Sequence, residues 1–267
     1  MPVHHSIATT RISQDDFKDL ASEVMRHVFA IHNEFGRLFD ELIYKRELAA
    51  RLPGVVLEAP VTVTHGGFSK TYSLDVLVHG CGLFEFKATD AIHPRHRGQT
   101  LNYLFLFDPA HGKIINVRSE RVEHEFVNCP SRLAELRDPQ VIDSAWNPRI
   151  NGAAAFRDTP MALIGDWGAG LEIPLYEAAL THLLGGEQTV LQPVAVFGQT
   201  GHLVDQRMRL AAPGVAFKIT AIHDDSDAST RLQAFETQSR KLLQHTSLQA
   251  IHWANLTHHQ ITFTTLH

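Results

Sequence analysis

The hydrophobic period of this sequence changes from helical to alternating, so the chain must combine helices with strands. From Ser13 to about Arg51 apolar residues recur at helical spacing, and a break at residues 33–36 divides this stretch into two helices. The further predicted elements are a hairpin of strands at 55–64 and 70–78 that turns at residues 65–67, a strand at 83–88, a helix at 94–107, and strands at 113–117 and 122–127. The predicted order is ααβββαββ.

The second half of the chain repeats the spacing of the first. A helical tyrosine precedes a lysine that follows phenylalanine on a strand: Tyr44 lies 43 residues before Lys87, and Tyr176 lies 42 residues before Lys218. A glutamine also precedes an asparagine by 17 residues in each half, at positions 99 and 116 and at positions 238 and 255. We interpret these spacings as an internal duplication. The alternative is two ordinary α/β segments that resemble each other by chance.

The segment between the two copies has a different composition. Residues 129–160 contain prolines at positions 130, 139, 148 and 160 and no sustained hydrophobic period, which is typical of a linker or a long excursion. We therefore expect a first domain at 1–128, a linker or excursion at 129–160, and a second copy at 161–267.

Composition and charge exclude several classes of protein. With 44% apolar and 20% charged residues the chain is globular, and no apolar run approaches the ~20 residues that span a bilayer. The first residues lack the layout of a signal peptide and the two cysteines cannot form a disulfide framework, so we expect a cytoplasmic protein without a membrane partner. Because the net charge is −5, nucleic-acid binding would depend on a local basic patch.

Histidine is unusually frequent, with 18 residues. A zinc site needs a fixed set of ligands at short spacings, and the sequence has no CxxC, HExxH or HxH; His93 and His96 come nearest. The histidines are better explained as scattered surface and core residues than as the ligands of a metal-binding protein.

The residues best suited to chemistry are Asp75, Glu85 and Lys87. Side chains at i and i+2 of a strand share a face, so Glu85 and Lys87 project together, and Asp75 on the preceding strand reaches the same place across the turn at 80–82. Two carboxylates and the Phe86 carbonyl form an oxygen-rich site for Mg²⁺ or Mn²⁺, with the lysine placed to orient or activate a water. This pattern predicts metal-assisted phosphodiester hydrolysis.

An acidic-x-Lys triplet alone is not diagnostic. With 29 acidic residues among 267 and few lysines, about one triplet is expected by chance, and two occur, the other being residues 16–18 on a helix. The position of Glu85 carries the interpretation, since a carboxylate and an ammonium on an apolar strand are costly unless they are paired or used.

Four motifs resemble those of one family. They are GRLFDELIY at 36–44, LDVLV at 74–78, FEFKA at 84–88 and QTLNY at 99–103. In this order they are similar to the GxxExxY proteins of the PD-(D/E)XK nuclease superfamily, over about residues 15–128, although Glu41 lies five residues after Gly36 where the family name implies three. The resemblance implies an α/β fold with a restriction-endonuclease-like core, a mixed sheet flanked by helices, and the duplication then implies two such cores.

The resemblance also implies an active site of Asp75, Glu85 and Lys87, with Glu41 as a further acidic or metal-linked residue. In addition, Gln99 and Tyr103, one helical turn apart, would line the cleft; Tyr103 is equally well explained as a core aromatic residue. Residues 93–97 are the most cationic stretch near this site. Arg95 and Arg97 there suit phosphate contacts or simply a solvated loop.

The second copy lacks the acidic residues of the first. In the aligned sequence Ala216 takes the place of Glu85, Lys218 remains, and Asp205 or Gln206 lies near the place of Asp75. We expect a degenerate copy that keeps the fold without the chemistry and makes the chain a monomeric internal pseudo-dimer.

The leading hypothesis is a Mg²⁺-dependent nuclease acting on DNA. The alternative is a catalytically inactive binding or scaffold protein with the nuclease fold; the acidic net charge and the degenerate copy favour it, and the intact acidic residues and lysine of the first copy oppose it.

Overall fold

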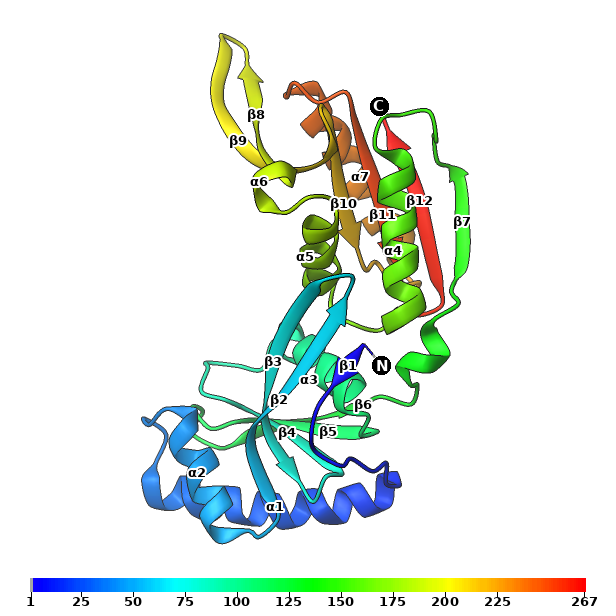
Figure 1. Cartoon of the computed structure of the whole chain (residues 1–267). Helices are drawn as coiled ribbons and strands as arrows, with labels where there is room; N and C mark the ends of the chain where they lie inside the picture. The colour runs from blue at the N-terminus through cyan, green and yellow to red at the C-terminus, as the bar shows by residue number, and fades with distance from the viewer. Residues whose placement is uncertain (1) are drawn as a thin grey trace. The chain divides into compact units, whose positions relative to one another are not determined.

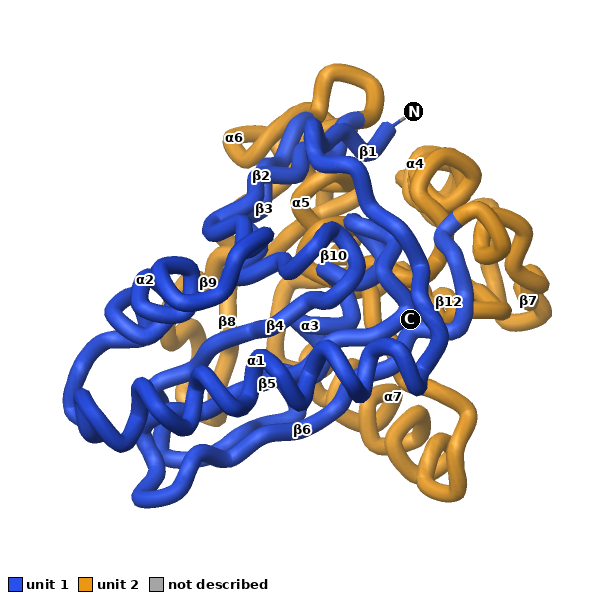
Figure 2. The backbone as a smooth tube through the Cα atoms, turned by 90° about the horizontal axis from the view of Figure 1, so that it is seen from below, with its two compact units in different colours: residues 1–64, 69–133 blue, residues 65–68, 134–267 orange. Residues whose placement is uncertain are grey.

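The structure is a computed structural model that describes residues 2–267, and it divides into two compact units (Figures 1 and 2). Unit 1 comprises Met1–Thr64 and Ser69–Leu133, and unit 2 comprises His65–Phe68 and Ala134–His267. Each unit has one six-stranded sheet with helices against it, so the predicted α/β class with mixed sheets is confirmed. Among the helices of residues 2–267, none has both the length and the hydropathy to cross a membrane.

Unit 1 follows the predicted order, with one short strand added at its start. Its elements are β1 (Val3–His4), α1 (Gln14–Phe35), α2 (Glu41–Arg51), β2 (Val55–His65), β3 (Phe68–Val78), β4 (Gly82–Lys87), α3 (Pro94–Phe107), β5 (His111–Asn116) and β6 (Glu123–Asn128). The strands lie in the order β1-β2-β3-β4-β5-β6. β4 and β5 are parallel and are connected by the crossover helix α3, whereas β5 and β6 are antiparallel.

The two faces of this sheet have different roles because side chains alternate along each strand. Helix α1 begins after Ser13, whose side chain accepts from the backbone N–H of Asp16 at 3.1 Å, and its apolar face packs on the sheet (Figure 1). Phe17 of α1 stacks on Phe84 of β4. Phe84 and Phe86 therefore face α1, and the residues between and beside them face the other way, toward α3.

Unit 2 has a second set of elements. They are β7 (Gln140–Ala145), α4 (Ala153–Trp167), α5 (Ile173–Leu183), α6 (Glu187–Val190), β8 (Leu191–Gly198), β9 (Gly201–Ala212), β10 (Val215–Thr220), α7 (Ala228–Gln244), β11 (Ala250–Leu256) and β12 (Gln260–Leu266), and a 3₁₀ helix, η1 (Leu133–Leu136), precedes them. The strand order is β7-β12-β11-β10-β9-β8.

Residues 129–160, which the sequence analysis describes as a linker or excursion, contain regular structure. They include η1, the strand β7 and the first half of α4, and β7 pairs in parallel with β12 at the edge of the second sheet. The sequence hides β7 because most of its side chains are exposed, so no alternating pattern marks it. Pro160 lies inside α4 although proline usually ends a helix.

The two sheets share one topology, which fits the predicted duplication. In each unit two adjacent strands are followed by a third, β4 or β10, which is parallel to the next strand, β5 or β11. A crossover helix connects the two parallel strands. The last strand, β6 or β12, is antiparallel to the strand before it. Strands β2 to β6 correspond in order to β8 to β12, and α3 corresponds to α7. The units differ in the added edge strand, which is β1 beside β2 in unit 1 and β7 beside β12 in unit 2.

A tyrosine–glycine contact before each sheet supports the same correspondence. The Tyr44 hydroxyl donates to the carbonyl of Gly36 at 2.5 Å, and the Tyr176 hydroxyl donates to the carbonyl of Gly168. Both glycines end a helix with positive φ, 73° and 83°, a conformation that glycine adopts without strain. Each unit thus uses one tyrosine to fix the corner between its first two α-helices.

Replacing Tyr176 by phenylalanine is expected to lower the free energy of unfolding by about 2 kcal/mol, because the buried Gly168 carbonyl loses its partner. The same change at Tyr44 is expected to cost about 1 kcal/mol or less, since Gly36 is exposed and water can replace the hydroxyl. Urea unfolding of both variants measures the difference, and equal losses would contradict this account.

Candidate active site

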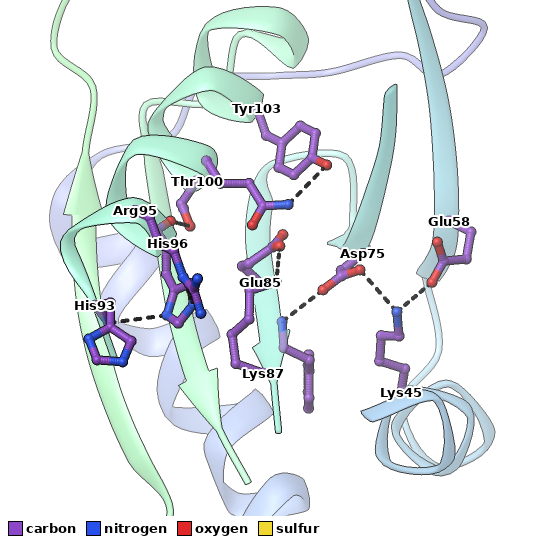
Figure 3. Close-up of polar contacts among 12 residues, drawn as sticks. Lys45, Glu58, Asp75, Glu85, Lys87, His93, Arg95, His96, Thr100 and Tyr103 are labelled. Atoms are coloured by element: carbon purple, nitrogen blue, oxygen red, sulfur yellow. Dashed lines mark hydrogen bonds and ion pairs between the residues drawn. The ribbon is translucent and has the colours of Figure 1, made fainter. Parts of the chain in front are cut away.

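The three residues expected to carry the chemistry lie on the α3 face of the unit 1 sheet, opposite α1. Glu85 and Lys87 share this face of β4, and Asp75 joins them from the neighbouring strand β3 (Figure 3). The structure therefore brings together the three side chains that the sequence singled out.

Asp75 is held from two sides. Its Oδ2 accepts from the backbone N–H of Phe86 at 3.0 Å, which links β3 to β4, and its Oδ1 accepts from Nζ of Lys45 at 2.9 Å. The residue is only 9% exposed. Asp75 is thus a fixed carboxylate rather than a mobile surface residue, as a residue that positions a ligand must be.

Glu85 is the most buried acidic side chain of the site, at 1% exposure. Its Oε1 lies 2.5 Å from Nζ of Lys87, and its Oε2 is buried without a hydrogen-bond partner among residues 2–267. Burial raises the pKa of Glu85 to about 7, with a further contribution from the charge of Asp75, and Lys87 only partly opposes the rise. Burial and the neighbouring carboxylate therefore disfavour the charged form of Glu85 even with Lys87 beside it.

Glu41 is the first residue of α2 and is half-buried. Its pKa is raised, first by burial and then by the charge of Asp75. Glu41 is therefore close enough for the charges of the site to shift its pKa, although it makes no hydrogen bond with the other acidic side chains of the described site.

The sequence analysis missed two further charged residues, Lys45 and Glu58. Lys45, 3% exposed, forms ion pairs with both Asp75 and Glu58. Burial opposes its charge, but the hydrogen bonds to the two carboxylates outweigh that effect and raise its pKa. Lys45 lies one helical turn after Glu41, which is a signal that sequence reading could have used.

Glu58 has no comparable sequence signal. It lies on β2 with a positive φ of 51°, a conformation that is rare for residues other than glycine. Its carboxylate also accepts from the hydroxyl of Ser73 at 2.9 Å. Only the folded chain places this carboxylate beside Lys45.

The residues expected to line the cleft come from α3. Tyr103, 6% exposed, lies on the same side as Glu85 (Figure 3), and the Gln99 side-chain amide donates to its hydroxyl at 3.4 Å. The hydroxyl has this polar partner, and the ring packs edge-on against Tyr72 at 6.4 Å between centroids. Tyr103 is thus a buried, packed aromatic residue that also lies on the side of the sheet that carries Glu85.

The two candidate phosphate-binding arginines have different partners. Nη2 of Arg97 lies 2.7 Å from Oε2 of Glu125 on β6, so its charge is already paired. Nε of Arg95 lies 3.2 Å from Nε2 of the buried His96. Arg95 is therefore the better placed of the two for a new anionic partner.

The donor groups suit a hard divalent ion that keeps much of its water. No group of three His, Cys, Asp or Glu side chains within residues 2–267 is arranged to hold a metal ion. Mg²⁺ commonly uses only one or two carboxylates, with waters completing its shell. Asp75 and the unpartnered oxygen of Glu85 can supply these two. A positive charge bound beside Glu85 would favour the ionised form of this carboxyl, whose pKa burial raises.

Part of the chain is similar to one known family of proteins. Residues 18–128 match the family model of the PD-(D/E)XK nuclease superfamily. Nucleases of this superfamily generally use divalent metal ions. The matched segment contains every candidate residue described above, whereas assignment to the GxxExxY subfamily stays a prediction.

No curated protein matches the chain. A solved structure titled "Crystal structure of SSO0001" is 21% identical, with a TM-score of 0.28, over 45% of this chain; the match spans only 61% of that protein.

The PD-(D/E)XK match ends before the second sheet, whose corresponding strand carries different residues. In unit 1 Lys87 of β4 pairs with Asn116 of β5, and in unit 2 Thr220 of β10 pairs with Asn255 of β11. Each asparagine also binds the chain just beyond the preceding strand, at Thr89 and at Ile222. These contacts place Lys218, rather than Ala216, at the position of Glu85, so the alignment proposed from the sequence is shifted by two residues.

The acidic residue of β3 has no acidic counterpart nearby in unit 2. Asp205, which the sequence alignment placed near the position of Asp75, pairs with Ala195 of β8 and contacts His202. β9 pairs with β10 only from Leu210 onward, five residues later. A lysine therefore takes the position of the buried glutamate, and neither carboxylate of unit 1 is reproduced there.

Proposed function

We propose that this protein is a Mg²⁺-dependent nuclease that hydrolyses phosphodiester bonds in DNA, with Mn²⁺ as an alternative ion. The observation that supports this best is the convergence of Asp75, Glu85 and Lys87 on one face of the sheet, with a buried Glu85 oxygen that has no partner among residues 2–267. The match of residues 18–128 to the nuclease superfamily supports the same reaction class.

The carboxylates would act as ligands in this proposal. Asp75, Glu85 and the Phe86 carbonyl would hold the ion, and Glu41 would approach from α2 or bind one of its waters. A bound divalent ion supplies Lewis acidity to the phosphoryl oxygen and a nucleophile near neutral pH. The hydrogen bond from the Phe86 N–H keeps Asp75 in the orientation that this role requires.

The cationic and polar residues would act on the substrate. Lys87 reaches the site from the same strand as Glu85 and would orient the attacking water and stabilise charge in the transition state. Gln99 and Tyr103 would line the cleft. Arg95, and Arg97 after release from Glu125, would contact the phosphates of DNA.

The second candidate function is a catalytically inactive nuclease-fold protein that binds nucleic acid or acts as a scaffold. One observation favours it: Lys45 and Lys87 each already neutralise one carboxylate of the site. In the nuclease hypothesis the ion would have to compete with these lysines for the same two carboxylates.

A cleavage assay distinguishes the two functions. The wild-type protein and the Glu85→Gln variant are incubated with single-stranded DNA, double-stranded DNA and RNA, in Mg²⁺, in Mn²⁺ and in EDTA. The nuclease hypothesis expects cleavage of DNA by the wild type only, and only with a divalent ion. Absence of cleavage by both proteins on all substrates would favour the binding function.

We expect one Mg²⁺ site per chain, because the position of Glu85 is occupied by Lys218 in unit 2 and no carboxylate lies opposite it there. Isothermal titration calorimetry of the metal-free protein measures the stoichiometry, and sedimentation in the same buffer checks the expected monomer. Glu85→Gln should remove the Mg²⁺ signal, whereas Lys218→Met should leave it unchanged. Two equivalent sites in the wild type would contradict the proposed degeneracy.

A further inference from the structure

A groove lies on the face of the unit 1 sheet opposite the candidate active site. It has a volume of about 570 Å³ and runs between α1 and the strands β5 and β6. Met25, Arg26, Phe29, Lys113, His124 and Phe126 contribute most of its lining. Its volume lies within the range of about 300–1,000 Å³ that is usual for small-molecule sites.

Lys113 is the unusual residue of this groove. It is only 4% exposed, and it has no hydrogen bond or ion pair with any residue from 2 to 267. Its nearest recorded contact is the ring of Phe126, 3.8 Å from Nζ to the centroid. The other two buried or nearly buried lysines of unit 1, Lys45 and Lys87, both lie against carboxylates.

The acidic residues of the neighbouring strand cannot serve Lys113, because they point to the opposite face. On β6 Glu125 binds Arg97 and Glu123 binds Asn116, whereas Phe126 and His124 alternate with them and face the groove. None of the residues lining the groove is acidic. The groove therefore keeps an excess of positive charge around a buried ammonium.

Apolar surface surrounds this charge. Phe29 of α1 is 42% exposed and Phe126 of β6 is 44% exposed. The Phe29 ring lies 6.5 Å from that of His124, between centroids, and Met25 fills the side of the groove beside it. A cation framed by exposed aromatic rings complements a ligand that has both an aromatic body and a negative group.

Burying the charge of Lys113 without such a ligand also costs free energy of folding. Desolvation lowers its pKa, and the pKa of the adjacent His124 is lowered by burial and then by the charge of Lys113. A buried charge is normally paired, and an apolar side chain would fill this position at lower cost if no anion were bound.

We propose that the α1–β6 groove binds a small organic monoanion with an aromatic body, whose negative group contacts Lys113 and whose rings lie against Phe29 and Phe126. Arg26 adds a second cation at the rim; its only ion pair among the described residues is a long one of 3.9 Å with Glu23. The site is separate from the catalytic face, so it does not depend on the proposed nuclease function.

The test uses two dyes that differ mainly in charge. The fluorescence of 1-anilinonaphthalene-8-sulfonate reports binding of the aromatic monoanion, and N-phenyl-1-naphthylamine has the same rings without the sulfonate. We expect the wild type to bind the anionic dye at least about tenfold more tightly than the neutral one, as a charge-assisted contact with a buried ammonium should provide. Lys113→Met should remove this preference while keeping the neutral dye.

Two variants make the result specific. Lys113→Arg keeps the charge and should retain the preference for the anionic dye. Lys70→Met removes another lysine that lies over an aromatic ring, Tyr72 at 4.7 Å, but lies outside the groove, and it should change neither affinity. Thermal unfolding of each variant confirms that it is folded.

Three outcomes would overturn the proposal. The first is equal affinity of the wild type for both dyes, and the second is unchanged binding of the anionic dye by Lys113→Met. The third is a wild-type protein that binds neither dye and sediments as a dimer, which would show that a second copy of the chain covers this face.

Discussion

Replacing Glu85 by glutamine is expected to abolish Mg²⁺-dependent cleavage of DNA, with a loss in kcat/KM of at least about a thousandfold, or ~4 kcal/mol. Glutamine keeps the size of the side chain but cannot carry the negative charge that a divalent ion requires. Oε2 of Glu85 is the one buried acidic oxygen of the described site without a hydrogen-bond partner, so the substitution removes the buried ligand oxygen that is free to bind the ion.

Lys87→Met separates metal binding from chemistry. It should leave Mg²⁺ binding intact, since the Asp75 and Glu85 carboxylates remain, and should lower kcat by about a hundredfold, as loss of one group that stabilises transition-state charge typically does. Single-turnover cleavage and calorimetric Mg²⁺ titration measure the two quantities independently. Loss of metal binding in this variant would assign Lys87 a structural role instead.

A matched control comes from the exposed surface of α1. Asp19→Asn also removes one carboxylate by amide substitution, but at an exposed position outside the site, and should keep full activity. Equal activity of the wild type and Glu85→Gln would point to a contaminating nuclease.

The second large effect is on stability and appears without any metal. In EDTA, Glu85→Gln is expected to be more stable than the wild type by up to about 3 kcal/mol above pH 7, and equally stable below about pH 4. The reason is the raised pKa of Glu85, about 7 against an ordinary value of 4.5, which burial causes first and Asp75 increases.

The sign follows from the protons that each state holds. Below the ordinary pKa the carboxyl is protonated in both states, so its burial without charge costs the wild type little. As the pH rises from about 4.5 to 7 the unfolded chain releases the proton and the folded chain retains it, so wild-type stability falls until the folded group also ionises. Glutamine does not titrate, so the variant lacks this loss.

Urea unfolding of both proteins at intervals from pH 4 to pH 8.5 measures the difference. Contributions from other titrating groups, such as Lys45, largely cancel in it because both proteins carry them. A difference independent of pH would mean that Glu85 is charged throughout and that Lys87 neutralises it fully. Added Mg²⁺ should favour the wild type, which alone keeps both carboxylate ligands.

The sequence by itself determined which elements form and which chemical groups can meet along one strand. The change from helical to alternating period located the helices and strands of unit 1. The face of a helix or strand on which a side chain lies depends on local geometry alone, so the period of the apolar residues reports the type of element. The i, i+2 relation of Glu85 and Lys87 on a strand has the same local origin. Similar residue spacings in the two halves predicted a duplication, which the shared topology of the two sheets fits. The strand register nevertheless shows that Lys218 does not take the position of Lys87 that the tyrosine–lysine spacing assigned to it.

Only the tertiary structure decided which distant groups come together. Lys45 and Glu58 reach Asp75 from a helix and from another strand, and no period in the sequence encodes that contact. The register of β10 on β11 places Lys218 where the sequence alignment had placed Ala216, because hydrogen bonds between strands rather than spacing along one chain set that position. The exposed strand β7 is ordered by pairing with β12, a partner more than a hundred residues away in the sequence.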